Sequence, residues 1–461
     1  MPAKIGLLPF YIALYDKTNP KRRPQMQANA DLIAEEIRKL GVEVVQAPIS
    51  CVKPEFEKSI KLLEDNKVDA IVTLHLAYSP SLESIDAVAG TDIPVVILDT
   101  TPDYDFNFNV DCGEKIGPNH GIHGVQDFSN LLIRRKKPFV LVAGHWKHSA
   151  VITAKLKTAL EAATAASKFR NSRVGIIGKP FEGMGDFAVP YDKLKQDFNM
   201  TVVTYDQKDQ PTDADFDKKV AAEMEADKQR FITDKLTPEA HKTTAETCIR
   251  VRDWMEAQKL DAFTASFLDV NRKDGWDTVP FLEASKALAR GTGYAGEGDV
   301  LTANLVSAML SIYPETTFTE MFCPDWQNDQ IFLSHMGEAN VDLYAAKGNL
   351  VSKPYNFSDT GSPAVAYGIF KPGPAILVNL APIQDGKYRL LICNGICHAP
   401  ENPAPVECIK GWFKPKKNLP EFLETYSNNG GTHHSALCYN ADPQVLVYFA
   451  KLMGFEVVEV C

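Results

Sequence analysis

Residues 70–74 read Ala70-Ile71-Val72-Thr73-Leu74, a short and almost continuous apolar run that is rich in β-branched side chains. Such a run between turn-forming residues is typical of a strand in a parallel sheet covered on both faces. The first 170 residues contain three more runs of this kind: Val42-Glu43-Val44-Val45, Val95-Val96-Ile97-Leu98 and Phe139-Val140-Leu141-Val142. Residues 26–40 have apolar side chains at helical spacing and stop at Gly41. This alternation predicts a doubly wound α/β domain over residues 1–170.

The same pattern returns once in the middle of the chain. A strand-like run, Val174-Gly175-Ile176-Ile177-Gly178, opens this part, and further on a glycine-rich segment that begins at Gly291 precedes a helical pattern over residues 299–312. We expect that glycine-rich segment to be a loop, and we expect residues 171–315 to form a second doubly wound α/β domain.

The sequence pattern changes near residue 316. Residues 364–370, 375–380 and 388–393 are strand-like and are separated by turns rich in Pro and Gly. Short strands joined in this way favour antiparallel pairing. The sequence therefore predicts an α/β protein in which residues 316–461 form a C-terminal antiparallel, β-rich (α+β) domain.

Composition excludes several classes of function. The chain has 59 acidic and 49 basic residues, a net charge of −10, so it lacks the basic surface that proteins binding nucleic acid or an anionic membrane need. The nine cysteines are scattered and odd in number, which is typical of a reduced, cytoplasmic protein. Cys393 and Cys397 have no second pair that would complete a zinc site. The apolar start lacks a signal-peptide pattern. The expected partner is a small molecule.

Gly291-Thr292-Gly293-Tyr294-Ala295-Gly296 matches the glycine pattern of dinucleotide-binding folds, but it follows a helical pattern and not a strand, so we reject that reading. The next residue, Glu297, stands between Gly296 and Gly298 just before a helix. A carboxylate in this position can be directed into a cleft. The alternative is that Glu297 or Asp299 caps the following helix.

Glu320 lies in Thr317-Phe318-Thr319-Glu320-Met321-Phe322. In a strand, Phe318, Glu320 and Phe322 would share one face. A carboxylate buried between aromatic rings needs a cation or a hydrogen-bond donor, and a metal ion would supply the charge. The alternative is an edge strand whose carboxylate reaches water.

Three histidines complete the set of candidates. His335 follows Ile331 and Leu333 on a strand-like run, where a histidine is more often part of the core than a ligand. His433 and His434 follow two glycines, which suggests a ligand and its neighbour, although exposed histidine pairs are common. Two Glu with one or two His suit Mn²⁺ better than Mg²⁺, and the absence of Cys disfavours zinc.

These motifs, taken in order, resemble the metal-site motifs of L-arabinose isomerases, and more broadly those of the L-arabinose/L-fucose isomerase superfamily. The four quoted stretches are residues 293–299, 317–320, 333–336 and 430–434, and residues 119–124 and 144–146 also have counterparts in the family. The resemblance implies that a divalent metal, with Mn²⁺ the expected ion, is held by Glu297, Glu320, His335 and His434. Most of these ligands belong to the predicted C-terminal domain.

The resemblance also implies roles in the reaction. Glu297 and Glu320 would be the catalytic acid/base pair, and His433 would lie beside the metal and bind substrate. His123 matches a histidine that approaches the sugar from a neighbouring subunit, which implies a homo-oligomer, either a trimer or a hexamer. The segment around Tyr11, also expected to touch substrate, departs from the Gly-Ser-Gln-x-Leu-Tyr-Gly pattern of arabinose isomerases.

The expected activity is therefore that of an intramolecular oxidoreductase, a metal-dependent aldose–ketose isomerase that acts on a free L-arabinose-like pentose or a related hexose through an ene-diol intermediate. Two alternatives stay open. One is an isomerase of L-fucose, another deoxysugar or a modified hexose, which the divergent N-terminal segment favours. The other is a sugar-binding protein without catalysis.

Overall fold

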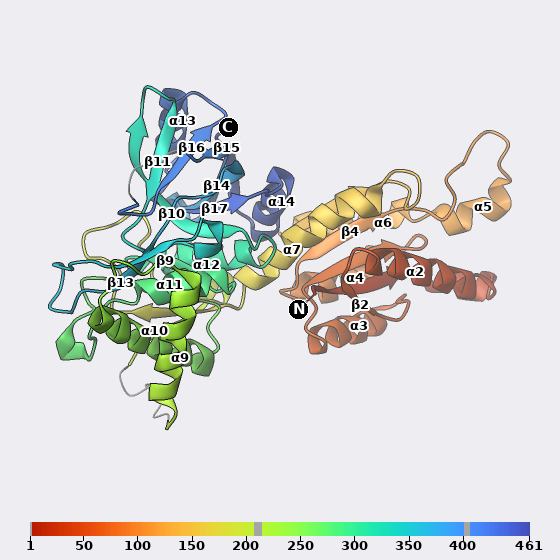
Figure 1. Ribbon diagram of the computed structural model, residues 1–461. Helices are drawn as coiled ribbons and strands as arrows, with labels where there is room; N and C mark the ends of the chain where they lie inside the picture. Colours follow the sequence, from red (N-terminus) through yellow and green to blue (C-terminus); the bar gives the residue numbers. More distant parts are fainter. Residues whose placement is uncertain (1, 207–213, 401–405) are drawn as a thin grey trace. The chain divides into compact units, whose positions relative to one another are not determined.

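In the computed structural model of the protein, residues 2–206, 214–400 and 406–461 are described. The chain divides into two compact units (Figure 1). The first unit contains Met1–Ser167 and Gln444–Gly454, and the second contains Lys168–Pro443 and Phe455–Cys461. The domain boundaries that the sequence predicts near residues 170 and 315 stay a prediction.

The first unit is built on a five-stranded parallel sheet in the order β2-β1-β3-β4-β5. Every residue of the central strand β3 is buried, as its continuous apolar run predicts. The strands are β1 (Lys4–Phe10), β2 (Glu43–Gln46), β3 (Ala70–His75), β4 (Val95–Asp99) and β5 (Phe139–Ala143). The predicted strands are confirmed. Strands lie on both sides of β1, with β2 on one side and β3 on the other, which is the arrangement of a doubly wound sheet.

Helices α3, α4 and α6 bury their apolar faces in one cluster with the sheet, through residues such as Phe56, Val88 and Phe128. The helix predicted over residues 26–40 is α2, and Gly41 follows its end with a φ of 83°. The helices of this unit are α1 (Ala13–Thr18), α2 (Arg22–Arg38), α3 (Lys53–Asp65), α4 (Ser81–Gly90), α5 (Cys112–Asn119), α6 (Ile122–Arg134), a π-helical turn (Val151–Leu156), most of α7 (Lys157–Phe169) and most of α14 (Pro443–Met453).

The second unit contains a four-stranded parallel sheet in the order β7-β6-β8-β9. Its strands are β6 (Arg173–Ile177), β7 (Thr201–Thr204), β8 (Ala262–Ala265) and β9 (Gly293–Gly296). The helices that accompany this sheet are α8 (Tyr191–Phe198), α9 (Phe216–Arg230), α10 (Pro238–Gln258), the 3-10 turn Arg272–Asp274, α11 (Phe281–Ala289) and α12 (Val300–Leu310). All residues of α12 are buried, which is why its sequence is apolar on every side.

The expectation that the glycines after Gly291 form a loop is wrong. Residues 293–296 are the buried strand β9, paired in parallel with β8. Glycine is required there because the strand is pressed against its neighbours. A Cβ on Gly293 would lie 2.3 Å from the Ala303 carbonyl oxygen, and a Cβ on Gly296 would lie 2.8 Å from the His335 ring.

The second unit also contains a seven-stranded sheet in the order β14-β17-β10-β11-β16-β15-β18. Because β14 pairs with β15 as well as with β17, six of these strands close into a barrel. Its pairs are antiparallel, as predicted, except that β18 joins β15 in parallel. The strands are β10 (Thr316–Asp325), β11 (Gln330–Ser334), β14 (Gly373–Pro382), β15 (Tyr388–His398), β16 (Gly411–Pro415), β17 (His434–Tyr439) and β18 (Glu456–Glu459).

Smaller elements complete this unit. Strands β12 (Asn349–Ser352) and β13 (Ala364–Tyr367) form a separate hairpin-like pair, and the helical segments are Val341–Leu343, Gln384–Gly386 and α13 (Leu419–Asn428). The predicted fold class, with parallel α/β sheets followed by an antiparallel β-rich part, is confirmed. Among the described helices, none is both long and apolar enough to cross a lipid bilayer.

Candidate active site

Glu297 is the first residue after β9 and lies at the carboxyl end of the parallel sheet, where its side chain is almost buried. Its backbone has a φ of 62°, a conformation that residues other than glycine rarely adopt. Two hydrogen bonds hold it there, from its own N–H to the Ala265 carbonyl (3.0 Å) and from the Phe181 N–H to its carbonyl (2.9 Å). The strained backbone is therefore fixed by two neighbouring segments, and this fixes where the carboxylate points.

Glu320 reaches the same place from the barrel. In the antiparallel register, Glu320 of β10 pairs with His434 of β17 on one side and with Ser334, the residue before His335, on the other. Its Oε1 atom lies 2.9 Å from His434 Nε2 and 3.4 Å from His335 Nε2. The edge-strand alternative is thus excluded, because Glu320 lies on a strand that is paired on both sides.

The expectation that Phe322 shares a face with Glu320 is wrong. A register shift between Met321 and Cys323 interrupts the pairing of β10 with β11 directly after the glutamate. Beyond this bulge the side chain of Phe322 is exposed, whereas Phe318 stays fully buried and packs edge-on against both His335 and His434. Bulges redirect side chains in this way and are frequent beside functional sites.

Each of the three histidines has its Nδ1 atom against a carboxylate and its Nε2 atom directed toward Glu297 or Glu320. The carboxylate partners are Glu338 for His335 (2.7 Å), Asp299 for His434 (3.0 Å) and Asp186 for His433 (2.7 Å). From the other ring nitrogen, His433 Nε2 lies 3.5 Å from Glu297 Oε2. A carboxylate on one imidazole nitrogen fixes the orientation of the ring and is the usual arrangement of a metal-binding histidine.

The two carboxylates are easily ionised. Burial raises the pKa of the Glu297 carboxyl, but the facing imidazoles of His433 and His434 outweigh burial and bring its pKa to about 2. Burial acts in the same way on Glu320, where the imidazoles of His335 and His434 hold the pKa well below its usual range. Both side chains are therefore carboxylates at neutral pH.

The carboxylates act on the histidines in the opposite sense. Burial lowers the pKa of His335, but Glu338 and Glu320 outweigh it and raise the pKa to about 10. For His434, burial is likewise outweighed, here by Asp299 together with both cluster carboxylates, so that its pKa lies well above the usual value. The carboxylates around His335 and His434 therefore favour positive charge between them. Protons on the imidazoles or a bound cation can provide it.

The donor set fits a divalent metal. One ligand atom from each of Glu297, Glu320, His433 and His434 can be chosen so that all four lie within 4.8 Å of one another. Within the described part of the chain, the buried His434 Nε2 has no hydrogen-bond partner despite its closeness to Glu320. Mixed oxygen and imidazole donors suit Mn²⁺. The structure brings His433 into this group, while His335 reaches it only through Glu320.

A second group of possible ligands, Glu223, Cys248 and Glu283, has a different character. Arg252 donates to both carboxylates (2.7–3.1 Å), and Lys286 donates to Glu223 (2.7 Å). These cations already neutralise the acids, so this group is a buried ion-pair network and not a metal site.

The chain is similar to known proteins over the residues that form this cluster. A family model described as the L-arabinose isomerase C-terminal domain matches residues 315–456, and one for the L-arabinose isomerase central domain matches residues 195–313. Together they cover more than half of the chain and include Glu297, Glu320 and the three histidines, His335, His433 and His434. The chain belongs to the L-arabinose isomerase family.

Individual members of the family are distant in sequence but similar over most of the chain. L-arabinose isomerase 1 of Bacillus licheniformis is 24% identical over 90% of this chain and 85% of its own length. The L-arabinose isomerase of Clostridium beijerinckii is 24% identical over 95% of this chain and 91% of its own length. A solved periplasmic solute-binding protein of Actinobacillus succinogenes with bound D-allose aligns at 12% identity over 67% of this chain and 91% of that one, with a TM-score of 0.17, which supports no inference.

The remaining predicted site residues of this L-arabinose isomerase family member, Tyr11 and His123, belong to the first unit. Tyr11 follows β1 and is fully buried, and within the described residues its hydroxyl has no hydrogen-bond partner. His123 lies in the first turn of α6 with its Nδ1 atom 2.9 Å from His120 Nε2. Their predicted contact with substrate stays a prediction.

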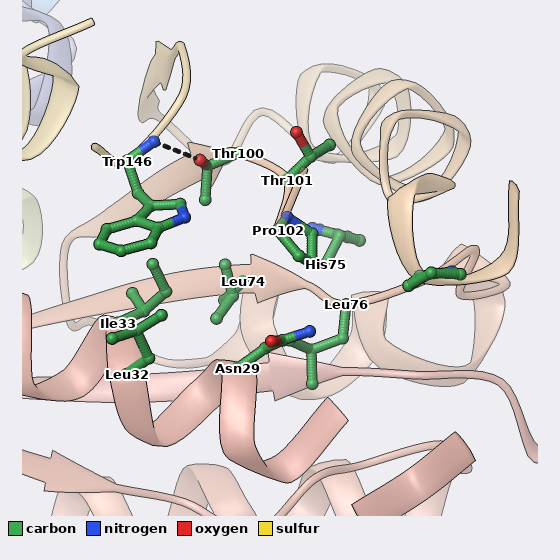
Figure 2. Close-up of a pocket in the computed structure, with 11 residues that line it drawn as sticks. Asn29, Leu32, Ile33, Leu74, His75, Leu76, Thr100, Thr101, Pro102 and Trp146 are labelled. Carbon is green, nitrogen blue, oxygen red and sulfur yellow. Dashed lines mark hydrogen bonds between the residues drawn. The ribbon is translucent and has the colours of Figure 1, made fainter. Parts of the chain in front are cut away.

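A small cavity lies in the first unit at the carboxyl ends of β3 and β4 (Figure 2). Leu32 and Ile33 of α2 lie on one side of it and the Trp146 ring on the other, while the Trp146 backbone N–H donates to Thr100 Oγ1 at 2.9 Å. Its volume of about 20 Å³ accommodates little more than a water molecule. Neither Tyr11 nor His123 lines it, and its small volume leaves no room for a sugar.

Sequence reasoning missed the three carboxylates behind the histidines. Asp299 was considered only as a helix cap, and it does cap α12 by accepting the Thr302 N–H at 2.9 Å while also contacting His434. Glu338 lies three residues after His335, a spacing that could have indicated it. Asp186 is 247 residues from His433, and no local signal connects the two.

Proposed function

We propose that the protein is a metal-dependent aldose–ketose isomerase that converts a free sugar, an L-arabinose-like pentose or a related hexose, through an ene-diol intermediate. Relatives named L-arabinose isomerase along most of the chain support the coarser statement that it is an aldose–ketose isomerase. The proposed metal dependence and ene-diol chemistry are supported by one observation. Glu297 and Glu320 come from two different sheets, and each places a carboxylate oxygen near the same nitrogen of His434, at 3.5 and 2.9 Å.

The proposed ligands of the divalent metal, Mn²⁺ by its donor chemistry, are Glu297, Glu320, His335 and His434. His433 also lies within reach of the same group, but we assign it to the substrate because it is the exposed one of the three histidines. When bound, a divalent cation stabilises negative charge on two neighbouring sugar oxygens and fixes the reacting edge of the sugar. Asp299 and Glu338 orient the two imidazoles from the protein side. The buried, fixed positions of these partners support a preorganised site.

Glu297 and Glu320 are the proposed acid/base pair. Interconversion moves hydrogen between C1 and C2, so one group must remove the C2 proton and return it to C1, and another must move the hydroxyl proton. Both side chains are ionised at neutral pH and can each accept a proton.

Two proposed substrate contacts come from the first unit, through Tyr11 and His123. If His123 serves a neighbouring subunit, as the family resemblance implies, the active protein is a homo-oligomer, either a trimer or a hexamer. We further infer a cytoplasmic, reducing location, which the free thiols of the described cysteines favour.

Two other functions compete with this proposal. The divergent segment around Tyr11 favours L-fucose, another deoxysugar or a modified hexose as substrate. A sugar-binding protein without catalysis would use the same residues but would not need two ionised carboxylates beside the histidines.

A panel of aldoses tested with Mn²⁺ separates these possibilities. We expect ketose formation from at least one aldopentose or aldohexose, with the best substrate identified by kcat/KM. Fastest conversion of a 6-deoxyhexose would favour the first alternative. Sugar binding without any ketose formation would favour the second and would contradict the proposal.

A further inference from the structure

The third carboxylate–histidine pair differs from the other two in its exposure. Glu338 and Asp299 are buried behind His335 and His434. In contrast, the side chains of Asp186 and His433 are 39% and 36% exposed. Two of the pairs thus face the interior, whereas the third lies at the solvent side of Glu297 and Glu320, where a sugar has to enter.

Asp186 holds both the backbone and the ring of His433. Its Oδ2 atom accepts the His433 backbone N–H at 3.0 Å and faces the ring Nδ1 at 2.7 Å. A side chain whose ring and main chain share one partner has little freedom to rotate. The remaining ring nitrogen, Nε2, is therefore turned toward Glu297 (3.5 Å) and Glu320 (3.9 Å).

The loop that carries Asp186 is fixed to the cluster at three points. This loop, residues 178–190, connects β6 to α8 at the carboxyl edge of the parallel sheet. Its Phe181 N–H donates to the Glu297 carbonyl, and the ring of Phe187 stacks on His434 at 5.1 Å with an interplanar angle of 17°. Asp186 is thus held within the site by the residues on both sides of it.

We propose that Asp186 is a positioning residue that aims His433 Nε2 at a hydroxyl of the bound sugar, so that the pair contributes to substrate recognition and not to metal binding. This inference rests on the proposed function. A hydroxyl can both donate and accept a hydrogen bond, so an imidazole nitrogen held at the open side of the carboxylates is a suitable partner for it. The loop between β6 and α8 is then part of what determines which sugar is accepted.

The test compares Asp186→Ala with Asp299→Ala in the full chain. For each variant, the Mn²⁺ dissociation constant is measured by electron paramagnetic resonance, and kcat and KM are measured with the best aldose. We expect Asp186→Ala to lower kcat/KM by about 10- to 100-fold, the usual loss for a hydrogen bond to a charged group, with an Mn²⁺ affinity within about threefold of wild type. Asp299→Ala should weaken Mn²⁺ binding by about 10- to 100-fold.

Two further variants control the comparison. Asp186→Asn keeps an oxygen that accepts a hydrogen bond and should recover most of kcat/KM, and Glu182→Gln, an exposed carboxylate of the same loop, should behave like wild type. Equal loss of Mn²⁺ affinity in Asp186→Ala and Asp299→Ala would make His433 a metal ligand and overturn the proposal, as would unchanged kinetics in Asp186→Ala.

One more measurement distinguishes this proposal from the proposed function. If wild type forms no ketose from any aldose, the proposed function fails. The ¹⁵N resonances of the His433 ring then still report on Asp186. Asp186→Ala should shift the Nδ1 resonance and Glu182→Gln should not, and an unshifted resonance would show that Asp186 does not position the ring.

Discussion

His434 and Asp299 are joined at the point where the parallel sheet and the barrel meet within the second unit. The Nδ1 atom of His434, the first residue of β17, lies 3.0 Å from Asp299 Oδ2, and both side chains are fully buried. The other oxygen of Asp299 caps α12 by accepting the Thr302 N–H. One carboxylate therefore contacts both a helix terminus and an imidazole of the candidate site.

This double role predicts that the two functions of Asp299 can be separated by substitution. Asn is as good a helix cap as Asp but carries no charge, so Asp299→Asn should leave stability nearly unchanged and weaken Mn²⁺ binding by about tenfold or more. Asp299→Ala should in addition lower the free energy of unfolding by about 1 kcal/mol. Thermal melts of the metal-free protein and Mn²⁺ titrations measure the two effects. Equal Mn²⁺ affinity in wild type and Asp299→Asn would count against His434 as a ligand.

The acid/base assignment predicts that charge, and not shape, is essential at two positions. Glu297→Gln and Glu320→Gln keep the size of the side chain but can neither accept a proton nor bind a cation well, so each should reduce kcat by at least about a thousandfold. Circular dichroism should show an intact fold. Near wild-type turnover in either variant would remove that glutamate from the mechanism.

The proposed metal site predicts full dependence on a bound cation. Treatment with EDTA followed by its removal should abolish ketose formation, and Mn²⁺ should restore it, since the carboxylates and imidazoles alone do not stabilise the charge on the sugar oxygens. Mg²⁺ should restore less, because it prefers oxygen ligands and water. Full turnover in protein shown by elemental analysis to be free of metal would contradict the site.

The fold, and the proposal that Glu297 and Glu320 belong to one site, could be predicted because both depend on local sequence patterns. Continuous β-branched runs such as residues 70–74 mark buried parallel strands, and Glu297 and Glu320 stand in motifs whose order along the chain resembles that of one family. Residue roles beyond these motifs depend on register. Glu320 faces His434 only because β10 and β17 pair with that alignment, and the bulge after Glu320 that exposes Phe322 leaves no clear trace in the sequence.

The glycines before Glu297 also show that local sequence does not predict tertiary contacts. Their spacing suggested a loop, but Gly293 and Gly296 lie in a strand that is pressed against α12 and against His335. Such close contact is a tertiary property. Asp186 was missed for the same reason, because its partner His433 lies in another element far along the chain.

The contact between Gly296 and His335 predicts a conformational effect on the site. In Gly296→Ala, the new methyl group would lie 2.8 Å from the His335 ring, so the imidazole or the strand must shift. We expect a lower kcat/KM and weaker Mn²⁺ binding in a protein that still folds. Gly90→Ala, where the added methyl group meets no atom within 4 Å, is the matched control. Wild-type Mn²⁺ affinity in Gly296→Ala would show that His335 is not needed as a ligand.

The buried ion-pair network of the second unit predicts how stability depends on pH. Burial raises the pKa of Glu223, but Arg252 and Lys286 outweigh it and bring the pKa from 4.5 to about 2. A carboxyl group with a lower pKa in the folded state stabilises the protein fully above its unfolded pKa, and this contribution is lost as the pH falls from about 5 toward 2. Its size is on the order of 3 kcal/mol. Chemical unfolding of the metal-free protein should therefore show Glu223→Gln to be much less stable than wild type at pH 7, with the difference shrinking steadily on acidification. Glu182→Gln, an exposed substitution, is the control, and a difference independent of pH would show that the charge of Glu223 does not stabilise the fold.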